Sequence, residues 1–319
     1  MPKVSVLLPV YNGMPYLPAA LESLLAQDFT DFEVIAIDDG SSDASGLYLD
    51  SCDDPRVRVV HQENHGLGAT LNIGLALSRG EYVARQDQDD VSLPNRFARQ
   101  VSYLDSNRRC GLLGTWATIW SEDNPTSRAI RHPTTNAELQ VLGLFDARFV
   151  HSSVMARRSD IIGAGGYPTA PNRNPPEDFD LWSRMARRCE VANLPQTLLT
   201  YREVGTSMSR EQADIIRTRG RAIGAENIAS HLGGDPRSPV YSDLVAMTRW
   251  ELDEVSPSAR WRDLDRVLRL LSAKLTKDLP NDAALVARTV RGLRLQLGRA
   301  WFRRARRAGL TARPSHTGG

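Results

Sequence analysis

The sequence predicts a largely parallel, doubly wound α/β sheet that is followed by a helical C-terminal region. In the first half of the chain, short β-branched apolar runs alternate with segments whose apolar residues recur at helical spacing. From about residue 210 the strand signals stop and helical patterns continue. Strands that alternate with helices in this way form parallel sheets with helices on both faces.

Four strands are expected before residue 90, each a short apolar run that ends at polar or turn residues. A helix carrying Leu17, Leu21 and Leu24 at helical spacing follows the first of them, and a second helix is expected at residues 67–78. The four strands are expected at residues 4–10, 32–37, 57–60 and 81–84.

The composition indicates an ordinary globular protein. The chain has 319 residues, 41% of them hydrophobic and 24% charged, with a formal net charge of +2. This charge gives no global basic field, which argues against a nucleic-acid partner. Cys52, Cys110 and Cys189 are too few and too far apart for a metal cluster or a disulfide framework. We see no signal peptide and no apolar run of ~18 residues, and therefore expect a cytoplasmic protein without a membrane span.

Asp87, Asp89 and Asp90 form the strongest local signal, at the end of the fourth expected strand. Three carboxylates within four residues repel one another unless a cation joins them. If this segment is extended, Asp87 and Asp89 point the same way and Asp90 the other way. Oxygen ligands of this kind suit Mg²⁺ or Mn²⁺ and leave positions for substrate phosphates. A solvated acidic turn is the alternative interpretation.

The polar ends of three expected strands should meet at one edge of the sheet, where ligands of such folds bind. They are Tyr11 with Asn12, Asp38 with Asp39, and the acidic cluster. The glycine-rich segment 64–69 lies near the same edge. It resembles a dinucleotide fingerprint only in part, because Leu71 stands at the third glycine position. We interpret Gly66 as part of a tight turn that opens a helix, with direct phosphate contact as the alternative.

The second half of this region is expected to contain a helix with Phe97, Val101 and Leu104, and then strands at residues 112–120 and 149–155. A Gly/Pro/Asn-rich loop over residues 163–176 is long enough to act as a mobile lid. It leads to an acidic first helical turn with Glu177 and Asp178. A carboxylate there is a candidate general base, and simple complementarity to the helix dipole is the alternative.

Taken together, these segments resemble glycosyltransferase family 2, over about residues 4–209. The resemblance implies a GT-A fold, which is a Rossmann-like, doubly wound mixed sheet, here with a helical C-terminal extension. It also implies an inverting transfer of a sugar from a nucleotide-diphosphate sugar to a hydroxyl group. The matching segments are residues 6–12, 37–43, 64–67, 71–74, 80–85, 87–90, 151–155 and 177–182.

The same resemblance implies roles for single residues. Asp178 matches the catalytic base, and Asp89 and, less firmly, Asp90 match the ligands of a Mn²⁺ or Mg²⁺ ion that bridges the donor diphosphate. Asp39 would accept a hydrogen bond from a ring N–H, which weakly favours a uridine or thymidine donor. The residues implied for nucleotide-sugar binding are Pro9, Tyr11, Asn12, Asp39, Gly66, Arg85, Asp87, His151 and Glu177.

Two departures from the family pattern limit these expectations. Val204 stands where relatives often carry a histidine near the metal, and a valine cannot ligate an ion. Ala246 stands where processive relatives carry the glutamine of a Gln-x-x-Arg-Trp motif. We therefore expect an enzyme that adds a single sugar.

The C-terminal third is expected to be helical, with breaks near residues 233–236 and 279–282. Its last helix places Val286, Val290, Leu293, Leu297 and Trp301 on one stripe and surrounds them with arginines. The stripe fits packing within its own domain or in a homodimer. The arginines fit either solvent or peripheral contact with an anionic inner membrane face.

We therefore predict a glycosyltransferase with domains at residues 1–209 and 210–319. Its partners would be a nucleotide-sugar donor and a saccharide or lipid-linked acceptor in polysaccharide, cell-envelope glycan or glycolipid synthesis. Two alternatives stay open. One is a non-catalytic nucleotide-sugar-binding module. The other is a sugar-phosphate nucleotidyltransferase, which would need a basic loop after the first strand that this chain lacks.

Overall fold

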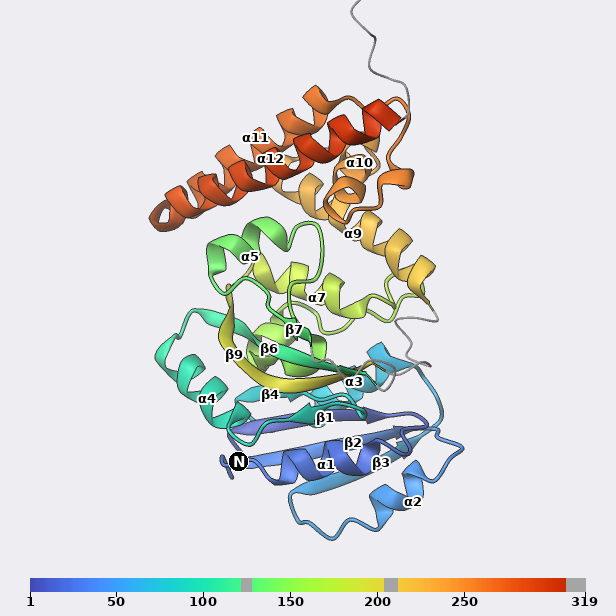
Figure 1. Ribbon diagram of the computed structural model, residues 1–319. Coiled ribbons are helices and arrows are strands. Elements are labelled where there is room, and N and C mark those ends of the chain that lie inside the picture. Colours follow the sequence, from blue (N-terminus) through green and yellow to red (C-terminus); the bar gives the residue numbers. More distant parts are fainter. Residues whose placement is uncertain (122–127, 204–211, 308–319) are drawn as a thin grey trace, which may run out of the picture. The chain divides into compact units, whose positions relative to one another are not determined.

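The structure is a computed structural model that describes residues 1–121, 128–203 and 212–307 (Figure 1). The chain divides into two compact units. The first comprises residues 1–139 and 147–219, and the second residues 140–146 and the chain from residue 220. Val204 and the border expected at residue 209 lie outside the described residues. The three cysteines are free thiols.

The described residues of the first unit form one nine-stranded mixed sheet in the order β3-β2-β1-β4-β8-β6-β9-β5, with β7 paired to β6. The pairs β3–β2, β2–β1 and β1–β4 are parallel, and β8 runs antiparallel to both β4 and β6. The strands are β1 Val4–Val10, β2 Phe32–Asp39, β3 Val57–Gln62, β4 Tyr82–Arg85, β5 Val91–Ser92, β6 Cys110–Ser121, β7 Arg128–Ile130, β8 Met155–Arg157 and β9 Glu190–Glu203.

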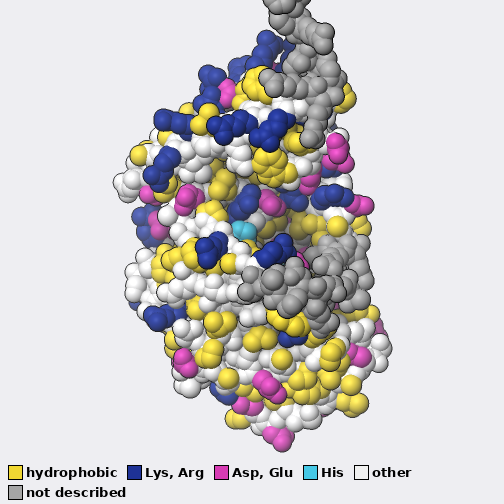
Figure 2. Space-filling model, in the orientation of Figure 1, with side chains coloured by type: hydrophobic (Ala, Val, Ile, Leu, Met, Phe, Trp, Pro, Cys, Tyr) yellow, Lys and Arg dark blue, Asp and Glu magenta, His cyan; other side chains and the backbone are white. Residues whose placement is uncertain are grey.

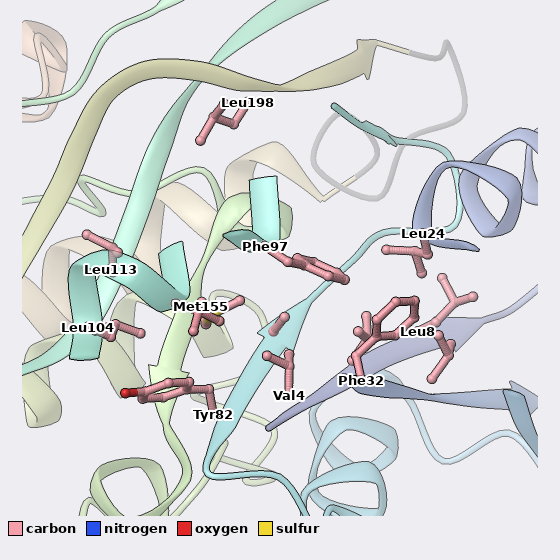
Figure 3. Close-up of a cluster of buried hydrophobic side chains, with 14 of the residues drawn as sticks. Val4, Leu8, Leu24, Phe32, Tyr82, Phe97, Leu104, Leu113, Met155 and Leu198 are labelled. Atoms are coloured by element: carbon pink, nitrogen blue, oxygen red, sulfur yellow. The ribbon is translucent and has the colours of Figure 1, made fainter. Parts of the chain in front are cut away.

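Helices cover both faces of this sheet, as the alternation of apolar side chains in β1 requires. Val4, Val6 and Leu8 pack with α1 and α4 in one core, part of which Figure 3 shows. Leu7 points to the opposite face and joins a second core formed with α3, α6 and α7. The helices of this unit are α1 Leu17–Leu25, α2 Ser45–Asp50, α3 Leu67–Leu77, α4 Arg96–Ser106, α5 Asn136–Leu142, which ends in the second unit, α6 Arg158–Gly163 and α7 Glu177–Ala186. The predicted doubly wound α/β architecture is confirmed.

The prediction of a strand at residues 149–155 is wrong for the central part of this segment. His151–Ser153 form a short 3₁₀ helix, η1, and strand β8 begins only at Met155. The hydroxyl of Ser153 donates to the carbonyl of Val150 at 2.8 Å, and its backbone N–H donates to the same carbonyl at 2.9 Å. Serine side chains that bond to nearby backbone groups offer the chain an alternative to a strand ladder.

The second unit is helical, as predicted. Helices α11 and α12 pack against each other, and Val286, Val290 and Leu297 of the predicted stripe are buried. The carboxylate of Asp265 in α11 accepts a hydrogen bond from Arg294 of α12 at 2.6 Å. No described helix combines the length and apolar character needed to cross a membrane. The elements are α9 Ala213–Leu232, which begins in the first unit, α10 Pro239–Thr248, η2 Leu252–Glu254, α11 Trp261–Asp278, η3 Pro280–Asp282 and α12 Ala283–Arg307.

Candidate active site

The loop after β1 is fastened to the acidic loop after β4. The Tyr11 N–H donates to Oε1 of Gln88 at 2.8 Å, and Nε2 of Gln88 donates back to the Tyr11 carbonyl at 3.0 Å. The ring of Tyr11 is 50% exposed, and Pro9, two residues earlier in β1, is half-buried. Through these two hydrogen bonds, Gln88 holds the backbone of Tyr11, whose ring is exposed, close to Asp87 and Asp89, the carboxylates on either side of Gln88. We name this pair of hydrogen bonds the Gln88 clamp.

Asn12 organises the neighbouring loop after β2. Its Oδ1 accepts a hydrogen bond from the Ser42 N–H at 2.8 Å, and its own N–H donates to Oγ of Ser41 at 2.9 Å. Its φ of 49° lies in the left-handed region, which asparagine tolerates better than most residues. The side-chain oxygen of Asn12 thus shapes the ends of β1 and β2.

Asp39, at the end of β2, is buried and holds the turn that opens α3. Its carboxylate accepts hydrogen bonds from the N–H groups of His65 at 2.9 Å and Gly66 at 3.0 Å, and from Nε2 of Gln62 at 2.7 Å. Gly66 has a φ of +80°, which a side chain would disfavour. The predicted tight turn is confirmed, and Asp39 is the residue that closes it.

The acidic segment is a turn rather than an extended strand end. The N–H of Asp90 donates to the carbonyl of Asp87 at 3.4 Å, so the expectation that Asp87 and Asp89 share the face of an extended segment is wrong. The buried guanidinium of Arg85 bonds to the Asp87 carboxylate and to the carbonyl of Gln86. A guanidinium at the base of the turn offsets part of the repulsion among the carboxylates.

Asp90 and Asp89 differ in their surroundings. The Asp90 carboxylate is buried and accepts hydrogen bonds from the Ser152 hydroxyl and from the N–H of Arg202, the latter at 2.8 Å. Burial, and then the charge of Asp87, raises the pKa of Asp90 well above its usual value. The same causes raise the pKa of Asp89 to about 6. These contacts give Asp90 a structural role and leave Asp89 as the more accessible carboxylate.

A fully buried arginine supports the acidic turn. In α4, Arg96 donates to Oε1 of Gln86 at 2.9 Å and to the carbonyl of Arg85 at 2.7 Å. It also donates to Oγ of Ser92 at 2.7 Å. Burial lowers its pKa to about 9. The guanidinium therefore supports both sides of the acidic turn through hydrogen bonds to amide, hydroxyl and carbonyl oxygens.

Glu177 begins α7, and its carboxyl is buried against an aromatic group of side chains. Its Oε1 lies 3.7 Å from Nδ1 of His151, whose Nε2 lies 3.4 Å from the hydroxyl of Tyr167. Burial, and then the charge of Asp178, raises the pKa of Glu177 to about 8, while burial lowers the pKa of His151 well below its usual value. At neutral pH both groups are therefore uncharged, and the contact is not an ion pair.

The loop expected to form a mobile lid is fastened at several points in this structure. Asn72 of α3 exchanges two hydrogen bonds with the backbone of Tyr167, at 2.8 and 2.9 Å. Arg173 donates to the carboxylate of Asp180 in α7 at 2.7 Å. The loop thus connects α3 to the helix that carries Glu177 and Asp178.

The 3₁₀ helix η1 contacts both the acidic turn and the first turn of α7. The hydroxyl of Ser152 in η1 donates to the Asp90 carboxylate, and Nδ1 of its neighbour His151 lies 3.7 Å from Oε1 of Glu177. Asp178 is half-buried and accepts a hydrogen bond from the N–H of Phe179 at 2.6 Å. The structure therefore brings the first turn of α7 and the acidic turn toward one region. Tyr11 and Asp39 lie at the ends of β1 and β2, and the Gln88 clamp joins the Tyr11 loop to the acidic turn.

Sequence reasoning missed Gln88, Arg96 and Tyr167. A signal existed for Arg96, because it stands four residues before Gln100 and next to Phe97 on the buried side of an amphipathic helix. Gln88 carried no such signal. Its partner Tyr11 is 77 residues away in the sequence, and only the fold brings them together.

The donor set suits a divalent cation that is shared with a substrate. Among the described residues, no three His, Cys, Asp or Glu side chains form a group that could hold a metal ion. Mg²⁺ and Mn²⁺ are usually held by one or two carboxylates together with substrate phosphates. Asp89, with a pKa raised by burial and by the Asp87 charge, is a carboxylate that such a cation would stabilise in its ionised form.

Comparisons with known proteins identify the family. The family model described as "Glycosyl transferase family 2" matches residues 5–165. The amylovoran biosynthesis glycosyltransferase AmsE of Erwinia amylovora is 34% identical over 204 residues, which cover 62% of this chain and 75% of AmsE.

Solved structures share the fold over nearly the whole chain. Residues 1–349 of S. aureus TarS in complex with UDP-GlcNAc match with a TM-score of 0.63 and 15% identity, covering 96% of this chain and 92% of that one. The mannosyltransferase PcManGT of Pyrobaculum calidifontis, in complex with GDP-Man and Mn²⁺, matches with a TM-score of 0.55 and 18% identity, covering 95% and 87%. The chain is a glycosyltransferase that belongs to family 2 and has the GT-A fold.

Proposed function

We propose that this glycosyltransferase moves a sugar from a nucleotide-diphosphate sugar to a hydroxyl acceptor, with inversion and with the help of a divalent cation. The observation that carries the proposal is that η1 contacts both groups: the Ser152 hydroxyl donates to Asp90 of the acidic turn, and His151 lies 3.7 Å from Glu177, the neighbour of Asp178 in the first turn of α7. A transfer of this kind needs a base on one side of the anomeric carbon and charge neutralisation at the leaving diphosphate on the other.

Asp178 is our candidate for the base. The neighbouring Glu177 keeps its proton at neutral pH because burial raises its pKa to about 8. A neutral Glu177 spares Asp178 the repulsion of a second negative charge in the same helical turn. Asp178 would take the proton of the acceptor hydroxyl as the new bond forms. One base and one displacement give inversion, without the second carboxylate nucleophile of a retaining two-carboxylate site.

Asp89, together with the oxygens of the donor diphosphate, would hold Mn²⁺ or Mg²⁺. A bound cation of this kind neutralises charge on the departing diphosphate. Asp87 would lie toward the ribose or the sugar, with its orientation set by Arg85. The complex of PcManGT with Mn²⁺ supports a divalent ion in this fold. The two hydrogen bonds that the Asp90 carboxylate accepts favour a supporting role over direct ligation.

The nucleotide would lie along the ends of β1 and β2. The exposed ring of Tyr11 offers a surface for the base, and Pro9 and Asn12 shape that loop. Asp39 would accept a ring N–H, consistent with a uridine or thymidine donor, and Gly66 would border the nucleotide. The S. aureus TarS structures contain UDP-GlcNAc or UDP, which supports this class of donor. His151 and Glu177 would face the sugar. Thermal shifts with a panel of nucleoside diphosphates, with and without Mn²⁺, test the base preference.

Replacing Asp178 with asparagine tests the base directly. We expect donor binding to persist while the transfer rate falls by at least ~10²-fold, because the general base is lost. Asp214→Asn is the matched control, since Asp214 is also an acidic residue in the first turn of a helix. Near-normal turnover of the Asp178 variant would remove that residue from the base role.

Activity assays of the unmodified chain separate the two alternative functions. A nucleotide-sugar-binding module would bind the donor and show no turnover in the unmodified chain. A nucleotidyltransferase would release pyrophosphate from a nucleoside triphosphate and a sugar phosphate.

The acceptor we propose is a saccharide or a lipid-linked saccharide to which a single sugar is added. The name of AmsE, an amylovoran biosynthesis glycosyltransferase, supports a role in glycan synthesis. Such an enzyme would act in the cytoplasm, at or near the inner membrane face. A homodimer formed through the helical unit is the competing use of that unit, and light scattering at several protein concentrations distinguishes the two.

A further inference from the structure

Helix α12 presents a solvent-facing side that combines arginines with exposed apolar residues. Val286, Val290 and Leu297 are buried, and they lie on the opposite side of the helix. Leu295 and Phe302 are 61% and 58% exposed. We call this side the basic–apolar face. It consists of Arg288, Arg291, Leu295, Arg299, Phe302 and Arg303, all exposed.

The six arginines of α12 at residues 288–304, whose side chains the structure describes, fall into two groups. Arg294 donates to Asp265 at 2.6 Å, and Arg304 donates to the carbonyl of Leu252 at 3.2 Å, so both help to fold the helical unit. The four arginines of the basic–apolar face make no ion pair or side-chain hydrogen bond with any residue that the structure describes. The helix sequence has eight arginines and no acidic residue, so α12 itself supplies no counter-charge to this face.

The neighbouring helix α11 is basic too, but its charges are partly neutralised. Lys274 pairs with Asp278, and Arg269 pairs with Asp265. Figure 2 shows Lys and Arg side chains gathered over the part of the molecule where Figure 1 draws α11 and α12, with hydrophobic side chains among them. Of these two helices, α12 therefore carries more of the positive charge that no acidic side chain neutralises.

We infer that the basic–apolar face of α12 docks on a membrane surface that contains anionic lipids. Four guanidinium groups without acidic partners complement the negative headgroup layer, and each basic residue near such a surface adds roughly 1 kcal/mol, or about fivefold, to binding. Leu295 and Phe302 project from the same side and would enter the boundary between headgroups and acyl chains. Arginine stems extend along that boundary while their charged ends stay at the headgroups. This inference does not depend on the proposed reaction.

Vesicle sedimentation with the full chain tests this inference. We expect binding to vesicles of equimolar phosphatidylcholine and phosphatidylglycerol, little binding to phosphatidylcholine alone, and weaker binding as salt is raised. The variant Arg288→Glu/Arg291→Glu/Arg299→Glu should lose on the order of 100-fold in partition coefficient. Leu295→Ser/Phe302→Ser should lose at least about tenfold, because burial of large apolar side chains is removed.

The matched control reverses three exposed arginines of the first unit, as Arg58→Glu/Arg99→Glu/Arg108→Glu. It makes the same change in net charge and should bind vesicles like the unmodified chain. The inference is overturned if the two triple variants lose binding equally. It is also overturned if the unmodified chain binds a nucleic acid homopolymer but no vesicle, or if the Leu295/Phe302 variant only dissociates a dimer. If circular dichroism shows that a variant does not fold, the dependence of vesicle binding by the unmodified chain on lipid charge and salt still tests the inference.

Discussion

Replacing Gly13 with alanine tests whether the Gln88 clamp holds the Tyr11 loop against the acidic turn. A methyl group at position 13 would lie 2.8 Å from Oε1 and 3.1 Å from Cδ of Gln88, which is inside van der Waals contact. Gly13 is not among the glycines with positive φ, so alanine meets no backbone penalty there. The Gln88 side chain must therefore move, and its two hydrogen bonds with Tyr11 lengthen or break.

The structure sets the size of the effect. Each of the two hydrogen bonds contributes about 0.5–1.5 kcal/mol, so Gly13→Ala should lower the free energy of unfolding by about 1–3 kcal/mol. Gln88→Ala should cost a similar amount because it deletes the same pair. In the double variant, the two Gln88 atoms that crowd the added methyl are gone, and the Cβ of Leu17 lies at an ordinary contact distance of 3.4 Å. The second substitution should then add almost nothing, which means that the two sites are strongly coupled.

Urea unfolding of the four proteins gives this coupling energy, and titration with UDP gives its effect on nucleotide affinity. We expect UDP to bind more weakly in each single variant, because the Tyr11 ring is no longer held beside the acidic turn. Gly292→Ala is the control. A Cβ there meets nothing within 4 Å, and alanine in a helix should add about 1 kcal/mol of stability. If Gly13→Ala costs the same with and without Gln88, within about 0.5 kcal/mol, the clamp does not exist in solution.

Two further predictions concern the ionisable groups of the site. Asp89→Ala should abolish the Mn²⁺-dependent part of UDP binding measured by calorimetry; an affinity that still rises with Mn²⁺ would remove Asp89 from the metal site. The pKa of Glu177 is raised from 4.5 to about 8 by burial, so the folded chain keeps a proton that the unfolded chain releases between these values, and the free energy of unfolding falls as pH rises through them. Glu177→Gln should flatten this slope in urea titrations at several pH values, whereas an unchanged slope would show that Glu177 is not the group responsible.

The elements that the sequence predicted best are those whose local pattern agrees with their burial. The continuous apolar run at residues 4–10 predicted a buried strand, and the two cores on opposite faces of the sheet confirm it, with Val4, Val6 and Leu8 in one and Leu7 in the other. The glycine turn before α3 was also predictable, because glycine takes a positive φ without steric cost and is therefore favoured in tight turns.

The shape of the acidic turn could not be predicted because its partners are distant in the chain. Asp90 is bonded to Ser152 and Arg202, which are 62 and 112 residues away. The same partners explain why residues 151–153 form a 3₁₀ turn instead of a strand, since the Ser152 hydroxyl is directed at Asp90. A prediction from hydrophobic periodicity uses only residues that are neighbours in the sequence. It therefore gave an extended conformation to residues 87–90 and to residues 151–153.

The hydrogen bonds of Asp39 limit how donor preference in this enzyme can be redesigned. The carboxylate that would recognise the base also ties down the entrance of α3, through His65 and Gly66. A substitution at Asp39 would change both the recognition of the nucleotide base and the order of the loop before α3. A kinetic screen cannot separate these two effects. Tyr11 is the better place for a library, because the residue is 50% exposed and its two hydrogen bonds with Gln88 run through its backbone, which stays in place when the side chain is exchanged.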